Sequence, residues 1–133
     1  MIQIGEPLGS WMILAARLCL AAVYLVSGVH KGIYYQKAVD EFRDGGIPAI
    51  GLFLPLTIVL HVLAPIALIS GILVQEAALA LAAFTVIATV QVHGFWRMSG
   101  PQKLARSRIA MAHLAVVGGL ILLAVVGPGS LVL

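Results

Sequence analysis

Four long apolar runs dominate the pattern of this chain, and shorter polar links separate them. The runs cover about residues 11–30, 52–73, 77–96 and 109–126. Each is long enough to cross the hydrocarbon core of a bilayer, which takes ~20 residues of helix. None alternates apolar and polar positions, and a backbone in lipid must satisfy its own hydrogen bonds, so we expect helices. The pattern predicts an all-α transmembrane four-helix bundle, as one domain over residues 1–133.

The links add detail to this prediction. Only residues 74–76 join the second and third runs, so these two helices must be antiparallel neighbours. In the first link, residues 34–43 gather apolar side chains on one helical face, which predicts a short amphiphilic helix at the membrane interface. The third link, residues 97–108, contains the pair Gly100–Pro101 and is expected to be a loop.

Composition and charge agree with a membrane protein. Hydrophobic residues make up 62% of the chain and charged residues 10%, and the mean hydropathy is +1.11. The net charge of +3 does not indicate nucleic-acid binding, because the basic residues lie beside apolar runs. Those in the two longer links are Lys31, Lys37, Arg43, Arg97, Lys103, Arg106 and Arg108. The positive-inside rule therefore predicts that both longer links are cytoplasmic and that both termini lie outside.

A polar stripe runs along the first predicted helix at steps of four and three residues. Its members are Arg17, Ala21, Tyr24, Gly28 and Lys31. Residues at these spacings share one face, and we expect this face to point into the bundle. For Arg17 we consider two arrangements: an ion pair with Glu76, or an extended side chain that reaches the outer interface.

One histidine lies in each predicted helix, and all of them fall in the same half of the bilayer. His30, His93 and His113 lie within ~5–6 Å of one interface at the helical rise per residue. His61 lies ~13 Å deep by the same measure. Pro65 has no N–H, so it leaves the carbonyl of His61 without its usual helical donor. An ionisable group at this depth is expensive, which indicates a functional site.

Four interpretations of the histidines remain open. A quinone would exchange protons with His61 or His93, and the residues around its head group would be His30, His113, Lys31, Arg97, Tyr24 and Trp96. A b-type haem would be held by His93 and His113, which lie at matched depth. Copper or zinc is the third ligand that imidazoles can bind. In the fourth interpretation the histidines only form hydrogen bonds between helices, worth ~1–2 kcal/mol or less each.

Several short motifs, in this order, resemble the DoxX family of small four-helix membrane proteins. They are Arg17-Leu18 with Leu25 to Lys31, Gly46-Ile47-Pro48, Ala67 to Ile72, Val92-His93 with Phe95-Trp96, and Ala112 to Gly119. The chain departs from the family at three places. His61 stands where a glutamate is expected, His113 where an asparagine is common, and Val74-Gln75 where Thr-Arg often follows the second helix. The two changes to histidine indicate a specialised site.

The resemblance implies a membrane subunit beside redox enzymes and the quinone pool. Relatives include the large subunit of an archaeal thiosulfate:quinone oxidoreductase and a membrane partner of mycobacterial thiol and superoxide detoxification enzymes. We therefore expect a multi-pass subunit of a respiratory or redox complex in a bacterial or archaeal cytoplasmic (inner) membrane. It would anchor other subunits and bind a quinone or haem b, and any catalysis would be that of a quinone-linked oxidoreductase. The alternative is a non-catalytic accessory subunit.

Overall fold

The computed structural model describes residues 4–91 and 99–131, and every regular element within these ranges is an α-helix. The helices are α1 (Leu8–Ile33), α2 (Tyr35–Asp44), α3 (Ile50–Ser70), α4 (Val74–Gln91) and α5 (Gly100–Val126). All except α2 are long and apolar enough to cross a membrane. The prediction of an all-α bundle with four membrane-spanning helices is therefore confirmed.

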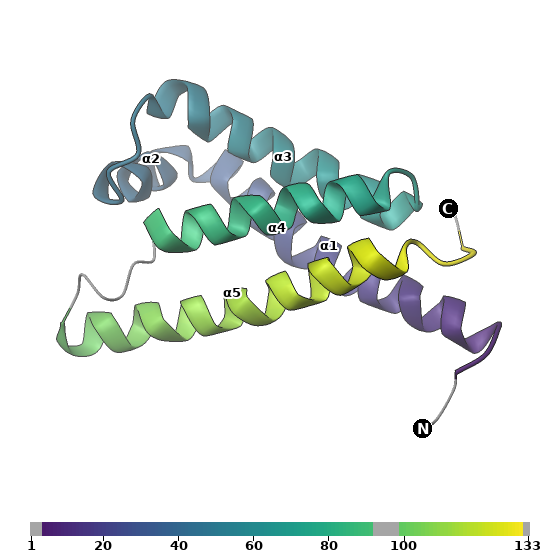
Figure 1. Cartoon of the computed structure of the whole chain (residues 1–133). Coiled ribbons are helices and arrows are strands. Elements are labelled where there is room, and N and C mark those ends of the chain that lie inside the picture. The colour runs from purple at the N-terminus through teal and green to yellow at the C-terminus, as the bar shows by residue number, and fades with distance from the viewer. Residues whose placement is uncertain (1–3, 92–98, 132–133) are drawn as a thin grey trace.

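The long helices alternate in direction along the bundle (Figure 1). α1 makes its most extensive contacts with α3, and α4 with α5, while α3 and α4 join the two pairs. Figure 1 shows α2, the start of α3 and the start of α5 at one end of the bundle, which we call the α2 end. The α3–α4 turn and the C-terminal end of α5 lie at the opposite end, the turn end. Depth in the bundle therefore follows position along each helix.

Helix boundaries agree with the sequence pattern except at the links. The predicted interfacial helix is α2, and its Ala38 and Phe42 pack against Leu54 of α3. The α3–α4 turn lies one helical turn earlier than predicted, because Gly71 ends α3 at a φ of 88° and Val74 already belongs to α4. α5 begins at Gly100, so the expected loop over residues 100–108 is wrong.

The start of α5 has a simple physical reason. Pro101 occupies the first turn of the helix, where its missing N–H has no helical acceptor to lose. A Gly–Pro pair thus begins a helix here instead of breaking one. The basic residues Lys103, Arg106 and Arg108 consequently lie on a helix, beyond its most apolar segment. Residues 92–96, the end of the third predicted helix, lie outside the described residues.

The core is built from small and medium apolar side chains. Ala21, Leu68, Ala78, Leu81 and Leu120 are completely excluded from solvent. Alanine lets helix backbones approach closely, and van der Waals packing of this kind is a main source of helix association in lipid. Other apolar side chains, such as Val26 at 68% exposure and Leu63 at 60%, point outward. This distribution fits a bundle whose outer surface contacts lipid.

α1 and α3 make their closest contact where Gly28 meets His61. A Cβ atom added at Gly28 would lie 2.9 Å from Cβ of His61 and 3.0 Å from its carbonyl oxygen. That carbonyl is the one that Pro65, a buried residue within α3, cannot pair by a helical hydrogen bond. Only a residue without a side chain allows the two backbones to approach this closely. The contact holds the backbone of His61 against α1.

Arg17 connects α1 to the turn end of the bundle. Its side chain is completely buried, and its guanidinium donates to Leu68 O at 2.7 Å and to Ile69 O at 2.8 Å. These oxygens belong to the last turn of α3, where carbonyls lack helical donors and the helix dipole is negative. The same group donates to Pro128 O and Leu131 O in the segment after α5.

These contacts correct the ion pair expected for Arg17. Its partners are backbone carbonyls and not the carboxylate of Glu76, whose side chain is exposed. The guanidinium does reach the turn end of the bundle, where the protein covers it completely. The predicted inward stripe is otherwise confirmed, because Ala21, Tyr24 and Gly28 are buried and Lys31 is half-buried.

We expect Gly28→Ala to destabilise the bundle by about 1–3 kcal/mol, because the new methyl group overlaps the backbone of His61. The measurement is thermal or denaturant unfolding of the purified protein in detergent. Gly32→Ala is the matched control, since a Cβ added at this position one turn further along α1 meets no atom within 4 Å. Equal destabilisation by the two substitutions would contradict the close α1–α3 contact.

We expect Arg17→Met to lower the free energy of unfolding by about 2–4 kcal/mol, because buried carbonyls lose their donors. Protease cleavage after residue 127 should become faster, since two of these carbonyls hold that segment. Glu76→Gln is the control and should change stability by less than about 0.5 kcal/mol, as for most surface substitutions. A large loss with Glu76→Gln would instead favour the ion pair.

Candidate functional site

His61 lies at the middle of α3 and therefore near mid-depth of the bundle. Its side chain is 4% exposed, and neither ring nitrogen has a hydrogen-bond partner among the described residues. The ring contacts Tyr24 at a centroid distance of 5.3 Å and Phe84 at 4.8 Å, both edge to face. Aromatic contacts of this geometry orient the imidazole, but they leave its donor and its acceptor unused.

A cavity of about 550 Å³ opens beside His61. It lies between α1, α3, α4 and α5, and α2 and the link to α3 close part of its α2 end. The side chains that line it are Val23, Tyr24, Ser27, Lys31, Glu41, Phe42, Ile47, Pro48, Phe53, Thr57, His61, Phe84, Thr85, Ile87, Ala88, Gln91, His113 and Val116. Nine of these eighteen side chains are apolar and nine carry a polar group, and apolar walls with polar groups among them suit the binding of a small organic molecule.

Several polar groups of the cavity wall already have partners. Thr57 donates to Phe53 O at 2.7 Å, and Thr85 donates to Leu81 O at 2.7 Å. Tyr24 and Thr85 also form a hydrogen bond. Because the single proton of the Thr85 hydroxyl is used for Leu81 O, Tyr24 must be the donor in this pair. The threonine bonds to Phe53 and Leu81 lie within α3 and within α4, and the Tyr24–Thr85 bond joins α1 to α4. All three hydroxyls are therefore engaged, in contrast to the nitrogens of His61.

Charged groups line the α2 end of the cavity. Lys31 donates to Ser27 Oγ at 2.6 Å and is half-buried. An ammonium has three N–H donors, so two of them remain for other acceptors. Glu41 of α2 lines the same space and is also half-buried. His113 of α5 is half-buried, and its Nδ1 forms a 2.8 Å hydrogen bond with Thr89 Oγ1 of α4.

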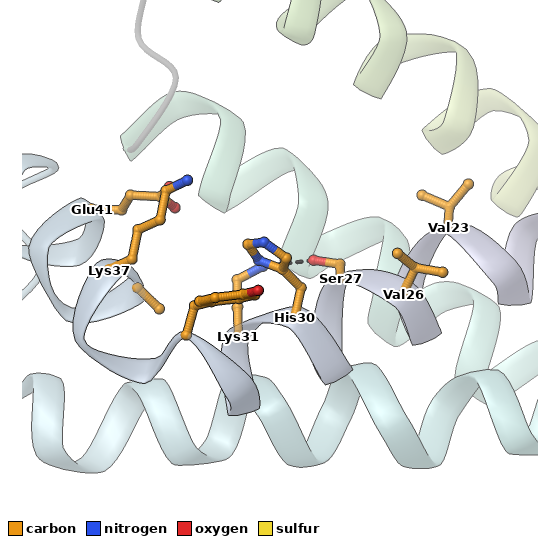
Figure 2. Close-up of a pocket in the computed structure, with 9 residues that line it drawn as sticks. Val23, Val26, Ser27, His30, Lys31, Lys37 and Glu41 are labelled. Atoms are coloured by element: carbon orange, nitrogen blue, oxygen red, sulfur yellow. Dashed lines mark hydrogen bonds between the residues drawn. The ribbon is translucent and has the colours of Figure 1, made fainter.

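A second, smaller space adjoins the cavity between α1 and α2. This groove of about 230 Å³ is lined by Val23, Val26, Ser27, His30, Lys31, Tyr34, Lys37, Ala38 and Glu41. Figure 2 shows Lys31 bonded to Ser27, with Lys37 and Glu41 projecting from α2. His30 lies in this groove and is exposed, and its ring packs against that of Tyr34 at a centroid distance of 4.7 Å and an interplanar angle of 42°. His30 does not line the cavity that contains His61.

The structure thus brings some of the predicted site residues together and separates others. His61, His113, Tyr24 and Lys31 line one cavity. His30 contributes to the neighbouring groove. The predicted residues His93, Trp96 and Arg97 lie outside the described residues. In the part of the chain that the structure describes, no three His, Cys, Asp or Glu side chains are grouped closely enough to hold a metal ion.

Sequence reasoning did not identify several members of the cavity wall. Phe84, which contacts His61 directly, lies in an apolar run and carries no distinguishing signal. Glu41 belongs to the amphiphilic segment, and nothing in its spacing indicated that it faces the same space as Lys31. The sequence does indicate that Thr57 lies beside His61, because it precedes His61 by four residues and therefore shares its face of α3.

Comparison with known proteins agrees with the motifs in the sequence. The sequence pattern of the DoxX family matches residues 12–94. The chain is 30% identical over 118 residues to inner membrane protein YqjF of Escherichia coli (strain K12), which covers 89% of this chain and 85% of that protein. It is 24% identical over 120 residues to inner membrane protein YphA of the same organism, covering 90% and 86%. No solved structure matches the chain.

The family match includes the residues that form the centre of the candidate site. Residues 12–94 contain α1, α2, α3 and α4, and with them Tyr24, Lys31 and His61. Only His113 and Val116 of α5 line the cavity from outside this range. The resemblance seen in the sequence is confirmed, and this chain belongs to the DoxX family of membrane proteins.

Proposed function

We propose that this protein is the inner-membrane subunit of a redox complex and that its cavity binds the head group of a quinone or quinol. The observation that carries the proposal is the buried imidazole of His61, which faces the cavity with both nitrogens unpartnered. A buried polar group without a partner costs about 1–3 kcal/mol. A ligand that pairs with the ring removes this cost.

Both redox states of a quinone suit the imidazole. A neutral imidazole has one nitrogen that donates and one that accepts. A quinone oxygen accepts a hydrogen bond, and a quinol hydroxyl can both donate and accept. His61 can therefore bind either state by turning a different nitrogen toward the ring oxygen. An imidazole is also the side chain best suited to hold a proton transiently near neutral pH.

The shape and lining of the cavity favour a flat apolar molecule. Its volume of about 550 Å³ lies within the roughly 300–1,000 Å³ of typical small-molecule sites. Phe42, Phe53 and Phe84 provide aromatic surface for an aromatic or quinonoid ring. Val23 and Ile87 line the cavity and are 50% and 63% exposed. We propose that an apolar ligand enters beside them from the lipid, without crossing water.

The charged α2 end of the cavity gives the head group a direction. Lys31 lies at this end, and its free donors would stabilise negative charge on a reduced ring oxygen. His113 lies at the rim and provides a second imidazole there. We propose that His61 exchanges the proton of the ring oxygen. His93 and Arg97, predicted to act in the same site, remain part of this proposal.

Electrons must come from elsewhere, because no side chain of this protein carries them between molecules. A bound quinone supplies two-electron redox chemistry once a donor is present. We therefore propose that a partner subunit docks on the membrane protein and delivers electrons to the cavity. The same partner would oxidise the primary substrate.

We expect His61→Leu to lower the amount of bound quinone about five- to tenfold, because a buried hydrogen bond to the head group is lost. The measurement is solvent extraction of the purified protein, before and after incubation with a short-chain ubiquinone, followed by ultraviolet spectroscopy. His30→Leu is the matched control and should keep its quinone, since His30 does not line the cavity. Unfolding temperatures of both variants show whether a loss reflects binding or assembly.

Other outcomes of this experiment would overturn the quinone proposal in defined ways. Soret and α absorption bands in the reduced protein would show a b-type haem. Of its two predicted ligands, His113 lines the cavity and His93 lies outside the described residues. Absence of both haem and quinone, together with a lower unfolding temperature in His61→Leu, would favour the non-catalytic accessory subunit. Equal quinone loss in His30→Leu and His61→Leu would place the ligand elsewhere.

We expect a soluble or peripheral redox enzyme to co-purify with the protein in a mild detergent and to reduce its bound quinone when substrate is added. The reason is that the cavity has no electron source of its own. The measurement is the absorbance of the quinone after addition of reducing substrates to the isolated complex. Recovery of the protein alone, under conditions that preserve other membrane complexes, would contradict the role as a complex subunit.

A further inference from the structure

We propose that the groove between α1 and α2 binds the phosphate of an anionic phospholipid. This groove adjoins the proposed quinone cavity and shares Val23, Ser27, Lys31 and Glu41 with it, whereas His30, Tyr34 and Lys37 line the groove and not the cavity. His30, Lys31 and Lys37 supply positive charge or N–H donors around the groove, and Tyr34 supplies a ring and a hydroxyl. Against these, Glu41 is the one acidic residue that lines it. With neutral imidazole the groove therefore has a surplus of positive charge.

The donors needed for a phosphate are present and accessible. Lys31 donates to Ser27 and retains two further N–H groups. Lys37 and His30 are exposed on opposite sides of the groove, one from α2 and one from α1 (Figure 2). A phosphodiester has non-bridging oxygens that accept charge-assisted hydrogen bonds, which are stronger than neutral ones. Its single negative charge matches the surplus of the groove.

The part of the groove nearer the middle of the bundle is apolar and suits contact with an acyl chain. Val23 and Val26 are 50% and 68% exposed and follow the charged residues toward the middle of the bundle. Val23 lies eight residues before Lys31, which is ~12 Å along a helix axis. The groove therefore changes from charged to apolar along the membrane normal, as a phospholipid does. A soluble phosphate would leave the apolar part uncovered, so we commit to a lipid.

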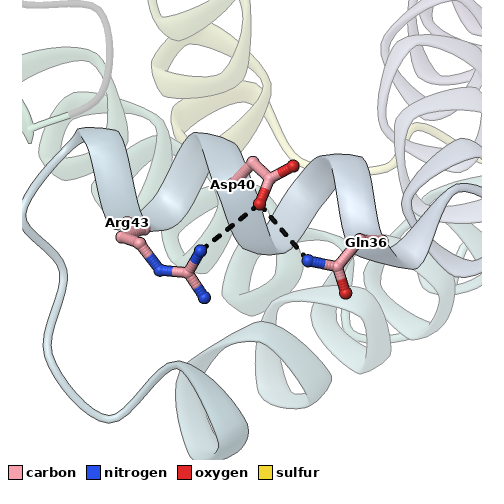
Figure 3. Close-up of polar contacts among 3 residues, drawn as sticks. All are labelled: Gln36, Asp40 and Arg43. Carbon is pink, nitrogen blue, oxygen red and sulfur yellow. Dashed lines mark hydrogen bonds and ion pairs between the residues drawn. The ribbon is translucent and has the colours of Figure 1, made fainter.

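The location of the groove agrees with this occupant. α2 is amphiphilic, with Ala38 and Phe42 packed inward. On its outer face Asp40 accepts a 3.3 Å hydrogen bond from Gln36 and pairs with Arg43 at 3.5 Å (Figure 3). The charge of Arg43 is therefore engaged away from the groove, whereas Lys37 points along it (Figure 2). Anionic lipids are concentrated in the cytoplasmic leaflet, which the sequence predicts for the α2 end.

The groove is also small enough to be selective. Its volume is about 230 Å³, less than half of the 550 Å³ of the cavity. This space accommodates a phosphate and part of its glycerol, while the acyl chains continue along the outer surface of α1. General attraction of lysines to a charged leaflet needs no groove. A specific lipid site therefore predicts that Lys37 matters more than other exposed lysines, whereas general attraction predicts equal effects.

The test compares lipids bound to the full-length purified protein by native mass spectrometry. We expect phosphatidylglycerol to bind more tightly than phosphatidylcholine, and Lys37→Gln to weaken phosphatidylglycerol about fivefold, the effect of one basic residue near a charged surface. Lys37 lines the groove and not the cavity, so the amount of bound quinone should not fall. Lys103→Gln is the matched control, an exposed lysine at the α2 end on α5.

Each remaining outcome overturns the proposal. Both lipids carry a phosphodiester, so their equal binding would show that the groove does not select a headgroup of net negative charge. Equal weakening by Lys37→Gln and Lys103→Gln would show general attraction to the leaflet. Displacement of phosphatidylglycerol by millimolar glycerol phosphate would assign the groove to a soluble anion. The unfolding temperature of Lys37→Gln should match that of the unsubstituted protein, since this exposed side chain has no packing role.

Discussion

The close contact between α1 and α3 at Gly28 and His61 determines the architecture of the site. Because Gly28 has no side chain, the backbone of His61 lies directly against α1. The ring then extends from this contact toward Tyr24 and Phe84, where the cavity begins. Pro65 belongs to the same arrangement, because it removes the helical donor of the carbonyl that faces Gly28. A larger residue at position 28 would move the imidazole and the cavity wall together.

Arg17 and His61 are both buried ionisable residues, but they differ in whether their nitrogens have hydrogen-bond partners. All three guanidinium nitrogens of Arg17 donate to backbone carbonyls, so its burial is explained by the helix ends that it connects. His61 is buried to a similar degree and has no such partner among the described residues. In a medium without water this difference is costly, which is why His61 and not Arg17 indicates a ligand.

Helical periodicity predicted the buried stripe of α1, yet it could not predict what Arg17 binds. Backbone carbonyls have no signature in the sequence, so a carboxylate such as Glu76 was the only visible partner. Depth alone also misplaced His30 relative to the cavity. His30 lies one residue before Lys31, which turns it ~100° away from the inward stripe and toward the groove. The cavity itself depends on how side chains from several helices fill space, which one sequence does not specify.

Lys31 is one of four residues that line both the groove and the cavity, with Val23, Ser27 and Glu41, and it is the basic one. Its ammonium is fixed by Ser27, which also lines both spaces. A negative charge in the groove would attract this ammonium. Its electrostatic stabilisation of a reduced ring oxygen in the cavity would then be weaker, because one cation cannot fully neutralise two anions. Substitution of Lys31 would therefore affect both ligands together. His61 lines the cavity and not the groove, and Lys37 lines the groove and not the cavity, so substitutions at these two residues can distinguish the sites.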